Sequence, residues 1–359
     1  MAILKIFSVY LVMGFFYVAF AGMGCPELGT LDCKCPNFPG YCITAGSKKF
    51  TYYKIAQNLV DYVASDAGID LQAVEGGSII NVKKMRWQHG VKFAIVQSDV
   101  LEYYRKEAKK GSRQASDLIQ RLRVILPLYN EEIHMITHPD SSIRYFQDIK
   151  GKRIALGKPD GGSAMTGLSI YSYMFGEEIA PENIYFSSFE DAVRSVADRK
   201  VDAWIMVVGQ PTKMFQVMKA EAKKFLRFVK FDSNDYRCKK ILKGPYYKAE
   251  IKRESYSWID ENIPTITVKA FLISQKYSKE MTKKNITNFT KSLCKNYSKL
   301  QENGHPKWKE VKLEKSPLPG GWKYSEDVEL AFKSIECNPN ASPCTELDKI
   351  LGLCEEENK

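Results

Sequence analysis

Apolar and polar positions along the chain follow two periods, one typical of buried strands and one typical of amphipathic helices. Residues 92–97 (KFAIVQ) form a short apolar run that predicts a buried strand, and residues 51–64 place Ile55, Leu59 and Val63 on one helical face. Glycine and serine stand between such strand-like and helix-like segments. The order of strand, glycine-containing turn and helix predicts βαβ units and a largely parallel sheet.

The same periodicities predict further elements on both sides of residue 130. Predicted strands cover residues 41–45, 70–74, 92–97, 123–128, 133–137, 183–186, 201–208 and 265–274. Predicted helices cover residues 51–64, 79–87, 163–175 and 189–197. After Phe231 the sequence is irregular and rich in tyrosine until the last strand, and the remainder is predicted to be mostly helical and polar.

The chain has 359 residues, more than one hydrophobic core usually supports, so two lobes are expected. Two α/β blocks followed by a late strand predict a discontinuous arrangement. The first lobe would take residues 43–130 and 232–359, and the second lobe would take residues 131–231. The predicted fold class is therefore α/β, with two lobes and a ligand cleft between them.

The first residues are typical of an export signal. Lys5 precedes an apolar run over residues 6–20, and Ala19-Phe20-Ala21 matches a cleavage site, so residues 1–21 are predicted to be a signal peptide. An uncleaved anchor is the alternative, but the run is short for a membrane span. Lipidation of Cys25, after Gly22-Met23-Gly24, is a further alternative. Each of these predicts a periplasmic or other extracytoplasmic protein.

Nine cysteines fit an oxidising compartment. Four of them lie in or at the end of a Cys-rich extension over residues 22–42, and three lie near the C-terminus. No C-x-x-C pair and no nearby histidine indicates zinc, so disulfides that tie down the termini are expected. The pairing stays open. No metal and no cofactor is predicted.

The net charge of +11 is compatible with nucleic acid, an anionic membrane or an anionic ligand. Lysine and arginine are scattered along the sequence rather than gathered in one block. An exported protein also has little reason to meet nucleic acid. The charge is therefore compatible with an anionic solute, and no nucleic acid partner is predicted.

Four predicted strand ends share one feature, which is small or hydroxyl residues directly before a helix. The four places are residues 46–53, 76–81, 97–99 and 161–166. A helix start offers unpaired N–H groups and a positive dipole end, so it can bind an anion. Serine and aspartate there also serve as ordinary helix caps. Since successive βα units present their helix starts at one sheet edge, four together predict a shared cleft for a small anionic metabolite.

Six segments, in order and at suitable spacing, resemble the TAXI branch of the solute-binding proteins of TRAP transporters. These segments are TYYKIAQNL (51–59), VEGGSIIN (74–81), FAIVQSDVLEYY (93–104), DIKGKRIALGKPDGGSAMT (148–166), VDAWIMVVGQP (201–211) and IPTITVKAFLIS (263–274). The resemblance runs from about residue 43 to residue 274. The Cys-rich extension and the residues after 274 carry no such motif.

The resemblance implies a type II periplasmic binding protein fold, an open-to-closed hinge and delivery of the solute to TRAP transporter membrane subunits. It implies a carboxylate ligand, such as glutamate, glutamine or a related dicarboxylate, and a monomer is expected. Together with the helix starts, it gives the candidate ligand-binding residues. They are Ser47, Thr51, Tyr52, Tyr53, Gly77, Ser78, Asn81, Gln97, Ser98, Asp99, Gly162, Ser163, Thr166, Gly209 and Pro211.

Two departures from the family pattern concern the ligand. Lys48 and Lys49 stand where the family usually carries proline or glycine, and Gly161-Gly162-Ser163 stands where Ser-Gly-Thr is usual. The identity of the ligand therefore stays open. Two alternative functions also stay open. A surface-attached sensor or adhesin could use the same fold without transport. An enzyme is less favoured, because no G-x-S-x-G, H-E-x-x-H or Walker motif is present, and no catalytic residue is predicted.

Overall fold

The computed structural model describes residues 40–334 and residue 337. The predicted signal peptide, the Cys-rich extension up to residue 39 and Cys25 lie outside the described residues. So do residues 335–336 and 338–359. Among the described helices, none combines the length and the hydrophobicity that crossing a lipid bilayer requires.

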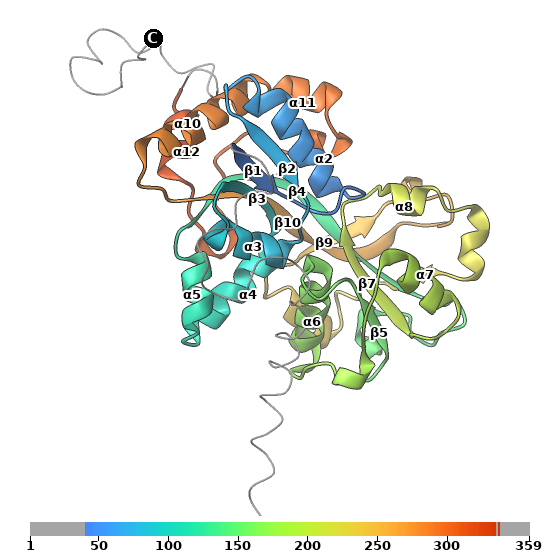
Figure 1. Ribbon diagram of the computed structural model, residues 1–359. Helices are drawn as coiled ribbons and strands as arrows, with labels where there is room; N and C mark the ends of the chain where they lie inside the picture. The colour runs from blue at the N-terminus through green and yellow to red at the C-terminus, as the bar shows by residue number, and fades with distance from the viewer. Residues whose placement is uncertain (1–39, 335–336, 338–359) are drawn as a thin grey trace, which may run out of the picture.

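A ten-stranded sheet runs through the whole molecule in the order β2-β1-β3-β10-β4-β7-β5-β6, with β8 paired to β4 and β9 paired to β10. Two long strands, β4 (Leu122–Thr137) and β10 (Ile263–Gln275), lie at its centre. Helices cover the sheet on both sides of this pair, so that the molecule has two lobes joined by β4 and β10 (Figure 1).

Lobe I contains the first βα units and the C-terminal helices. Parallel strands β1 (Tyr41–Thr44), β2 (Leu71–Val74) and β3 (Val91–Gln97) form its sheet edge. Its helices are α2 (Thr51–Asn58, continued as a π-helix over Leu59–Ala64), α3 (Ser78–Trp87), α4 (Ser98–Lys109) and α5 (Arg113–Ile119). Apolar residues at helical spacing, such as Ile55, Leu59 and Val63, are fully buried there.

The C-terminal segment packs onto the same lobe. It contains α10 (Glu280–Lys295), α11 (Tyr297–Asn303), a 3₁₀ helix (Pro306–Glu310) and α12 (Glu326–Phe332). Phe289 stacks on Phe93 of β3 at 4.3 Å between ring centroids, and a disulfide joins Cys294 to Cys337. Cys238 is a free, buried cysteine.

Lobe II is built on parallel strands β5 (Ile154–Leu156), β6 (Ile184–Phe186) and β7 (Ala203–Val208). Its larger helices are α6 (Gly162–Phe175), α7 (Phe189–Ala197) and α9 (Tyr236–Ile241). The short elements are α8 (Lys213–Gln216), β8 (Arg227–Phe228) and β9 (Tyr247–Ile251). Most of its apolar core lies between these strands and α6 and around Phe215.

The structure corrects several expectations. The sheet is mixed rather than largely parallel, because β10 is antiparallel to β3, β4 and β9, and β4 is antiparallel to β7. The strands predicted over 123–128 and 133–137 are one strand, β4. The region after Phe231 contains α9 and β9 rather than irregular chain.

The second crossing between the lobes lies on β10 rather than near residue 232. Residues Ile263–Thr267 of β10 pair with β9 of lobe II, and residues Ala270–Ile273 pair with β3 of lobe I. Cys238, Ile241 and Tyr246 belong to the apolar core of lobe II. Residues 232 to about 268 therefore belong to lobe II, because their apolar side chains are buried against β7 and α6 rather than against β3.

Candidate functional site

Three of the predicted helix starts lie where the two lobes meet. Helices α3 and α4 begin at Ser78 and Ser98 of lobe I, and α6 begins at Gly162 of lobe II. A Cβ atom on Gly162 would overlap the side-chain oxygen of Gln97 and lie 3.1 Å from Oγ of Ser78. A glycine is needed at this position for the two lobes to approach so closely.

The approach extends to the neighbouring turn. A Cβ atom on Gly77 would lie 3.2 Å from the carbonyl oxygen of Asp160 in lobe II. The structure thus brings Gly77, Ser78, Gln97 and Gly162 together from the two lobes, in a closed arrangement.

Asp99 is the main polar link across this contact. Its Oδ2 atom accepts a hydrogen bond from Oγ1 of Thr166 at 2.5 Å and another from the hydroxyl of Tyr246 at 3.0 Å. Both donors belong to lobe II, whereas Asp99 lies in the first turn of α4. Burial raises the pKa of Asp99 to about 6, against the effect of these hydrogen bonds.

Three of the predicted serines accept hydrogen bonds from backbone N–H groups of the protein framework. Oγ of Ser98 accepts from the backbone N–H of Lys269 at 3.2 Å, and Oγ of Ser163 accepts from that of Val207 at 3.0 Å. Ser78 Oγ likewise accepts from the N–H of Gln97 at 3.2 Å. These hydroxyls bond the ends of β3 and β7 and the middle of β10 in the closed arrangement.

Asn81 is also fully engaged and has no exposed surface. Its side-chain nitrogen donates to the carbonyl oxygens of Ala45 and Ile95, both at 2.8 Å. Its side-chain oxygen accepts from Thr44 at 2.7 Å and from the N–H of Gly77 at 3.2 Å. Asn81 therefore ties the turn before α3 to β1 and β3.

The four candidate residues of the first loop and of the start of α2 lie in different surroundings. The hydroxyl of Tyr52 donates to Oε2 of Glu131 at 2.5 Å in the interior, whereas that of Tyr53 lies 3.5 Å from the carbonyl oxygen of Ala73, within lobe I. Thr51 is buried at the start of α2 and Ser47 is half-buried. At the surface, Lys49 forms an exposed ion pair across the lobes with Glu190, at 3.1 Å.

Gly209 and Pro211 flank Gln210, which bonds Glu132 of β4. The bond between Gln210 and Pro211 is cis, and the N–H of Gln210 donates to Oε2 of Glu132 at 2.8 Å. A Cβ atom on Gly209 would lie 2.7 Å from Cε of Lys307 and 3.3 Å from the ring of Tyr129. The turn after β7 therefore packs directly against the crossing strand.

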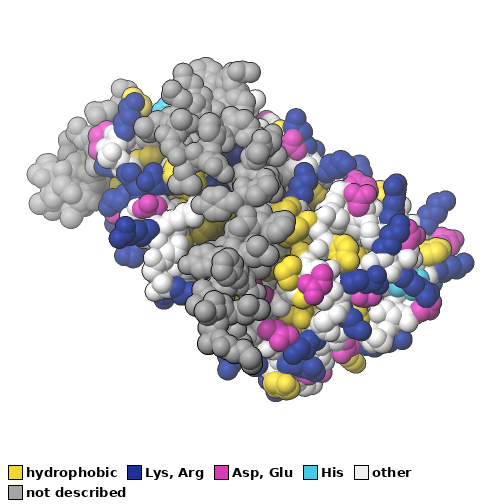
Figure 2. Space-filling view, turned by 60° about the horizontal axis from the view of Figure 1, so that its bottom comes forward, with side chains coloured by type: hydrophobic (Ala, Val, Ile, Leu, Met, Phe, Trp, Pro, Cys, Tyr) yellow, Lys and Arg dark blue, Asp and Glu magenta, His cyan; other side chains and the backbone are white. Residues whose placement is uncertain are grey.

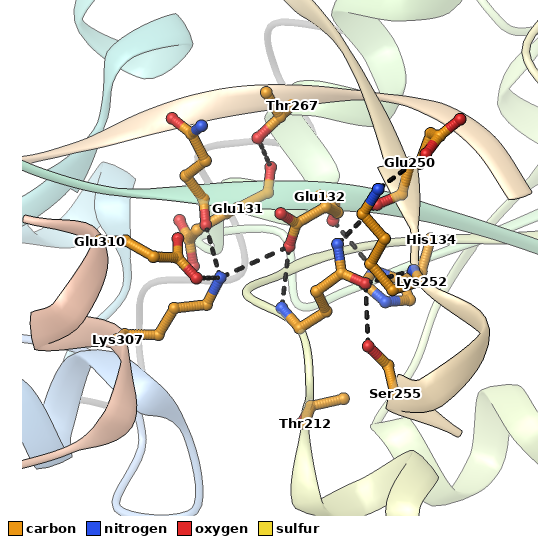
Figure 3. A network of polar contacts seen from close by, with 12 residues as sticks. Glu131, Glu132, His134, Thr212, Glu250, Lys252, Ser255, Thr267, Lys307 and Glu310 are labelled. Carbon is orange, nitrogen blue, oxygen red and sulfur yellow. Dashed lines mark hydrogen bonds and ion pairs between the residues drawn. The ribbon is translucent and has the colours of Figure 1, made fainter. Parts of the chain in front are cut away.

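Lys307, Glu131 and Glu132 are the charged residues that sequence reasoning missed (Figure 3). Lys307 comes from the C-terminal 3₁₀ helix, is 3% exposed, and lies 2.6 Å from Glu310 and 3.9 Å from Glu132. Two adjacent acids inside a mostly apolar strand were a signal for Glu131 and Glu132. No comparable signal marks Lys307, because only the fold brings it to β4.

A buried histidine, His134, lies on β4 close to Glu132. His134 has no exposed surface and bonds the carbonyl of Glu132 and the hydroxyl of Tyr256, each at 2.9 Å. Burial lowers its pKa to about 4. Within the part of the chain that the structure describes, no group of three or more His, Cys, Asp or Glu side chains could hold a metal ion.

The basic residues are spread over the surface. Figure 2 shows lysine and arginine side chains around the visible face, with acidic side chains between them. The net charge of +11 therefore does not gather over one element on this face.

Two α/β lobes, two crossing strands and helix starts that meet between the lobes define a two-lobed α/β fold. A model of the NMT1-like family matches residues 43–319. The chain belongs to the NMT1-like family.

Solved structures with a similar arrangement have low sequence identity to this chain. The arginine-, lysine-, histidine-binding protein ArtJ from Geobacillus stearothermophilus is 15% identical, with 72% of this chain and 90% of that chain covered and a TM-score of 0.42. A binding protein component of an ABC phosphonate transporter from Pseudomonas aeruginosa is 12% identical, with 71% and 74% covered and a TM-score of 0.43. Similarity at this level says nothing of what this chain binds.

Proposed function

We propose that this chain is the extracytoplasmic solute-binding subunit of a TRAP-type transporter of the TAXI branch. It captures a small carboxylate-bearing metabolite, similar to glutamate or glutamine, between its two lobes and delivers it to the membrane subunits. It binds this solute without turning it over. The proposal rests on the six sequence segments that resemble the TAXI branch and on the family to which the chain belongs.

The observation that carries the proposal is the meeting of helix starts from both lobes. Backbone N–H groups in the first turns of α3 and α6 have no partner within their helices, and the positive dipole ends favour an anion. Gly77 and Gly162 let the two lobes approach closely at this contact. A guest that bonds both starts would favour the closed state, because only contacts made to both lobes at once shift that equilibrium.

Calorimetry and small-angle X-ray scattering with glutamate and glutamine test this proposal. We expect saturable binding accompanied by a smaller radius of gyration. Thr166→Val removes one hydrogen bond between the lobes, so we expect the affinity to fall about tenfold and the unliganded protein to be more open.

Thr287→Val is the matched control. Thr287 donates a hydrogen bond to the carbonyl of Asp327 in lobe I, away from the contact between the lobes. The affinity for the solute and the radius of gyration should therefore stay as in the parent protein. Turnover of the solute, or absence of any binding by glutamate, glutamine and their dicarboxylate analogues, would contradict the proposal.

A further inference from the structure

The contact between the lobes contains more buried carboxylates than a site for a simple anion needs. Asp99, Glu131 and Glu132 are 3%, 5% and 6% exposed, and the nearby ammonium group of Lys307 is 3% exposed. An isolated carboxylate buried in this way is costly unless a cation or several hydrogen bonds compensate it.

Lys307 does not supply that compensation to all three. Its ammonium group lies 2.6 Å from Glu310 and 3.9 Å from Glu132. Among the described residues, neither Asp99 nor Glu131 forms an ion pair, and the side chains that bond their carboxylates are neutral hydroxyls, from Thr166 and Tyr246 for Asp99 and from Tyr52 for Glu131. Neither of these two buried acids has a described cation at ion-pair distance, although the charge of Lys307 favours the ionised form of Glu131 from farther away.

A second and independent observation lies next to them. The hydroxyl of Tyr129 is buried and has no hydrogen-bond partner among the described residues. The ring of Tyr129 packs edge-on against Tyr52 at 6.3 Å, and the Lys307 ammonium lies 5.7 Å from its centroid. Tyr129 therefore stands between the Tyr52–Glu131 pair and Lys307, with one polar atom unsatisfied in a place where that is costly.

The arrangement does not suit a metal ion. No described group of three or more His, Cys, Asp or Glu side chains is close enough together to ligate one. Asp99 of α4 and Glu131 of β4 are instead held by separate partners, Thr166 and Tyr246 for Asp99 and Tyr52 for Glu131. Separated single acceptors suit an organic cation, whose N–H groups point in several directions.

We propose that the guest carries a protonated nitrogen, and that Asp99 and Glu131 bind this cation while the Tyr129 hydroxyl bonds the same guest. This inference rests on the proposed function and narrows it. Amino acids such as glutamate and glutamine would bind, with their carboxylate at the helix starts and their ammonium group at the two acids. Dicarboxylates that lack the amine would not.

The proposal also predicts exchange of a proton with solvent. Burial raises the pKa of Glu131 to about 8, so at pH 7 its carboxyl group is mainly protonated before a cation arrives. The ammonium group favours the ionised form, so binding releases a proton at pH 7, and affinity increases from about pH 6 to pH 8. The groups that face the two acids are Tyr52 of α2, Tyr129 and Glu132 of β4, Thr166 of α6, Tyr246 and Lys307.

A matched pair of solutes provides the test. Titration calorimetry at pH 7 compares glutamate with glutarate, which differ only in the amine, and adds glutamine and lysine as further amines. We expect at least one amine to bind and glutarate to bind at least tenfold more weakly than glutamate. Repeating the titration in two buffers of different ionisation enthalpy should show proton release for the amines only.

Two substitutions identify the residues involved. Glu131→Gln keeps the size and the bond to Tyr52 and should weaken amine binding at least tenfold and abolish the proton release. Tyr129→Phe removes only the unsatisfied hydroxyl, so it should fold normally and weaken binding several-fold. Asp140→Asn, which removes an exposed carboxylate that pairs with Arg199, is the control. It should change neither the affinity for amines nor the proton release.

The outcomes separate the two proposals. If glutarate binds within threefold of glutamate, or if Glu131→Gln and Tyr129→Phe bind amines as the parent does, the cation inference is wrong while the binding function stands. If neither amines nor dicarboxylates bind, the proposed function itself fails, and this inference fails with it.

Discussion

At the scale of single residues, the predicted ligand contacts divide into those at the lobe contact and those within the framework. Asp99 and Thr166 bond each other across the lobes at 2.5 Å. Asn81 instead makes its hydrogen bonds within lobe I. Sequence patterns could not distinguish residues at the lobe contact from residues of the framework, because asparagine, serine and threonine after a strand also serve as helix caps.

The burial of Glu131 predicts how the stability of the protein depends on pH. Its raised pKa, about 8, means that ionisation is costlier in the folded than in the unfolded chain. The stability that the neutral acid contributes is present below its ordinary pKa of about 4.5 and is lost as pH rises toward 8. Glu131→Gln should therefore raise the free energy of unfolding at pH 8 by roughly 4 kcal/mol and have little effect at pH 4.5.

Urea denaturation at both pH values measures this change. Glu221→Gln is the control, because Glu221 is exposed in lobe II and should alter stability little at either pH. Equal stability of Glu131→Gln and the parent at pH 8 would contradict the assignment of a buried, uncompensated acid.

At the scale of elements, the start of α6 decides how closely the lobes approach. Gly162 has no side chain to separate α6 from Gln97 and Ser78. The sequence predicted a glycine-containing helix start here, and the structure shows the reason for the glycine. What faces this helix start depends on α3 and β3, more than 60 residues earlier, so local patterns could not predict it.

Gly162→Val is the corresponding prediction. The added side chain would overlap the Gln97 side chain, so the closed arrangement should be disfavoured and solute affinity should fall about tenfold or more. Small-angle scattering should report a larger radius of gyration. Ser172→Val, on the exposed side of the same helix, provides the matched control for a β-branched residue in α6 and should stay as compact as the parent.

At the scale of the whole molecule, the C-terminal segment completes lobe I and reaches the crossing strands. Trp308 is fully buried in the lobe I core, and the neighbouring Lys307 lies at β4. The disulfide between Cys294 and Cys337 closes a loop with a sequence separation of 43 around this segment.

Removing that disulfide should destabilise the molecule. A loop of this length restricts the unfolded chain, so Cys294→Ala with Cys337→Ala should lower the free energy of unfolding by about 2–4 kcal/mol. Thermal denaturation with and without a reductant measures it. A reductant also breaks the disulfide of Cys42, so the reduced parent protein should melt no higher than the double variant. An equal melting temperature of the oxidised parent and the double variant would show that the disulfide between Cys294 and Cys337 contributes no stability.

The sequence by itself determined the local elements and the two-lobed α/β class, because strand and helix periods, glycine turns and helix starts are properties of neighbouring residues. It also placed Ser78, Gln97, Asp99 and Thr166 at strand ends and helix starts. Only the tertiary structure decided that β10 makes the second crossing, that Asp99 meets Thr166, and that Lys307 lies beside Glu132. These are contacts between segments far apart in the chain, and they depend on how whole lobes bury their apolar surfaces, which local spacing does not encode.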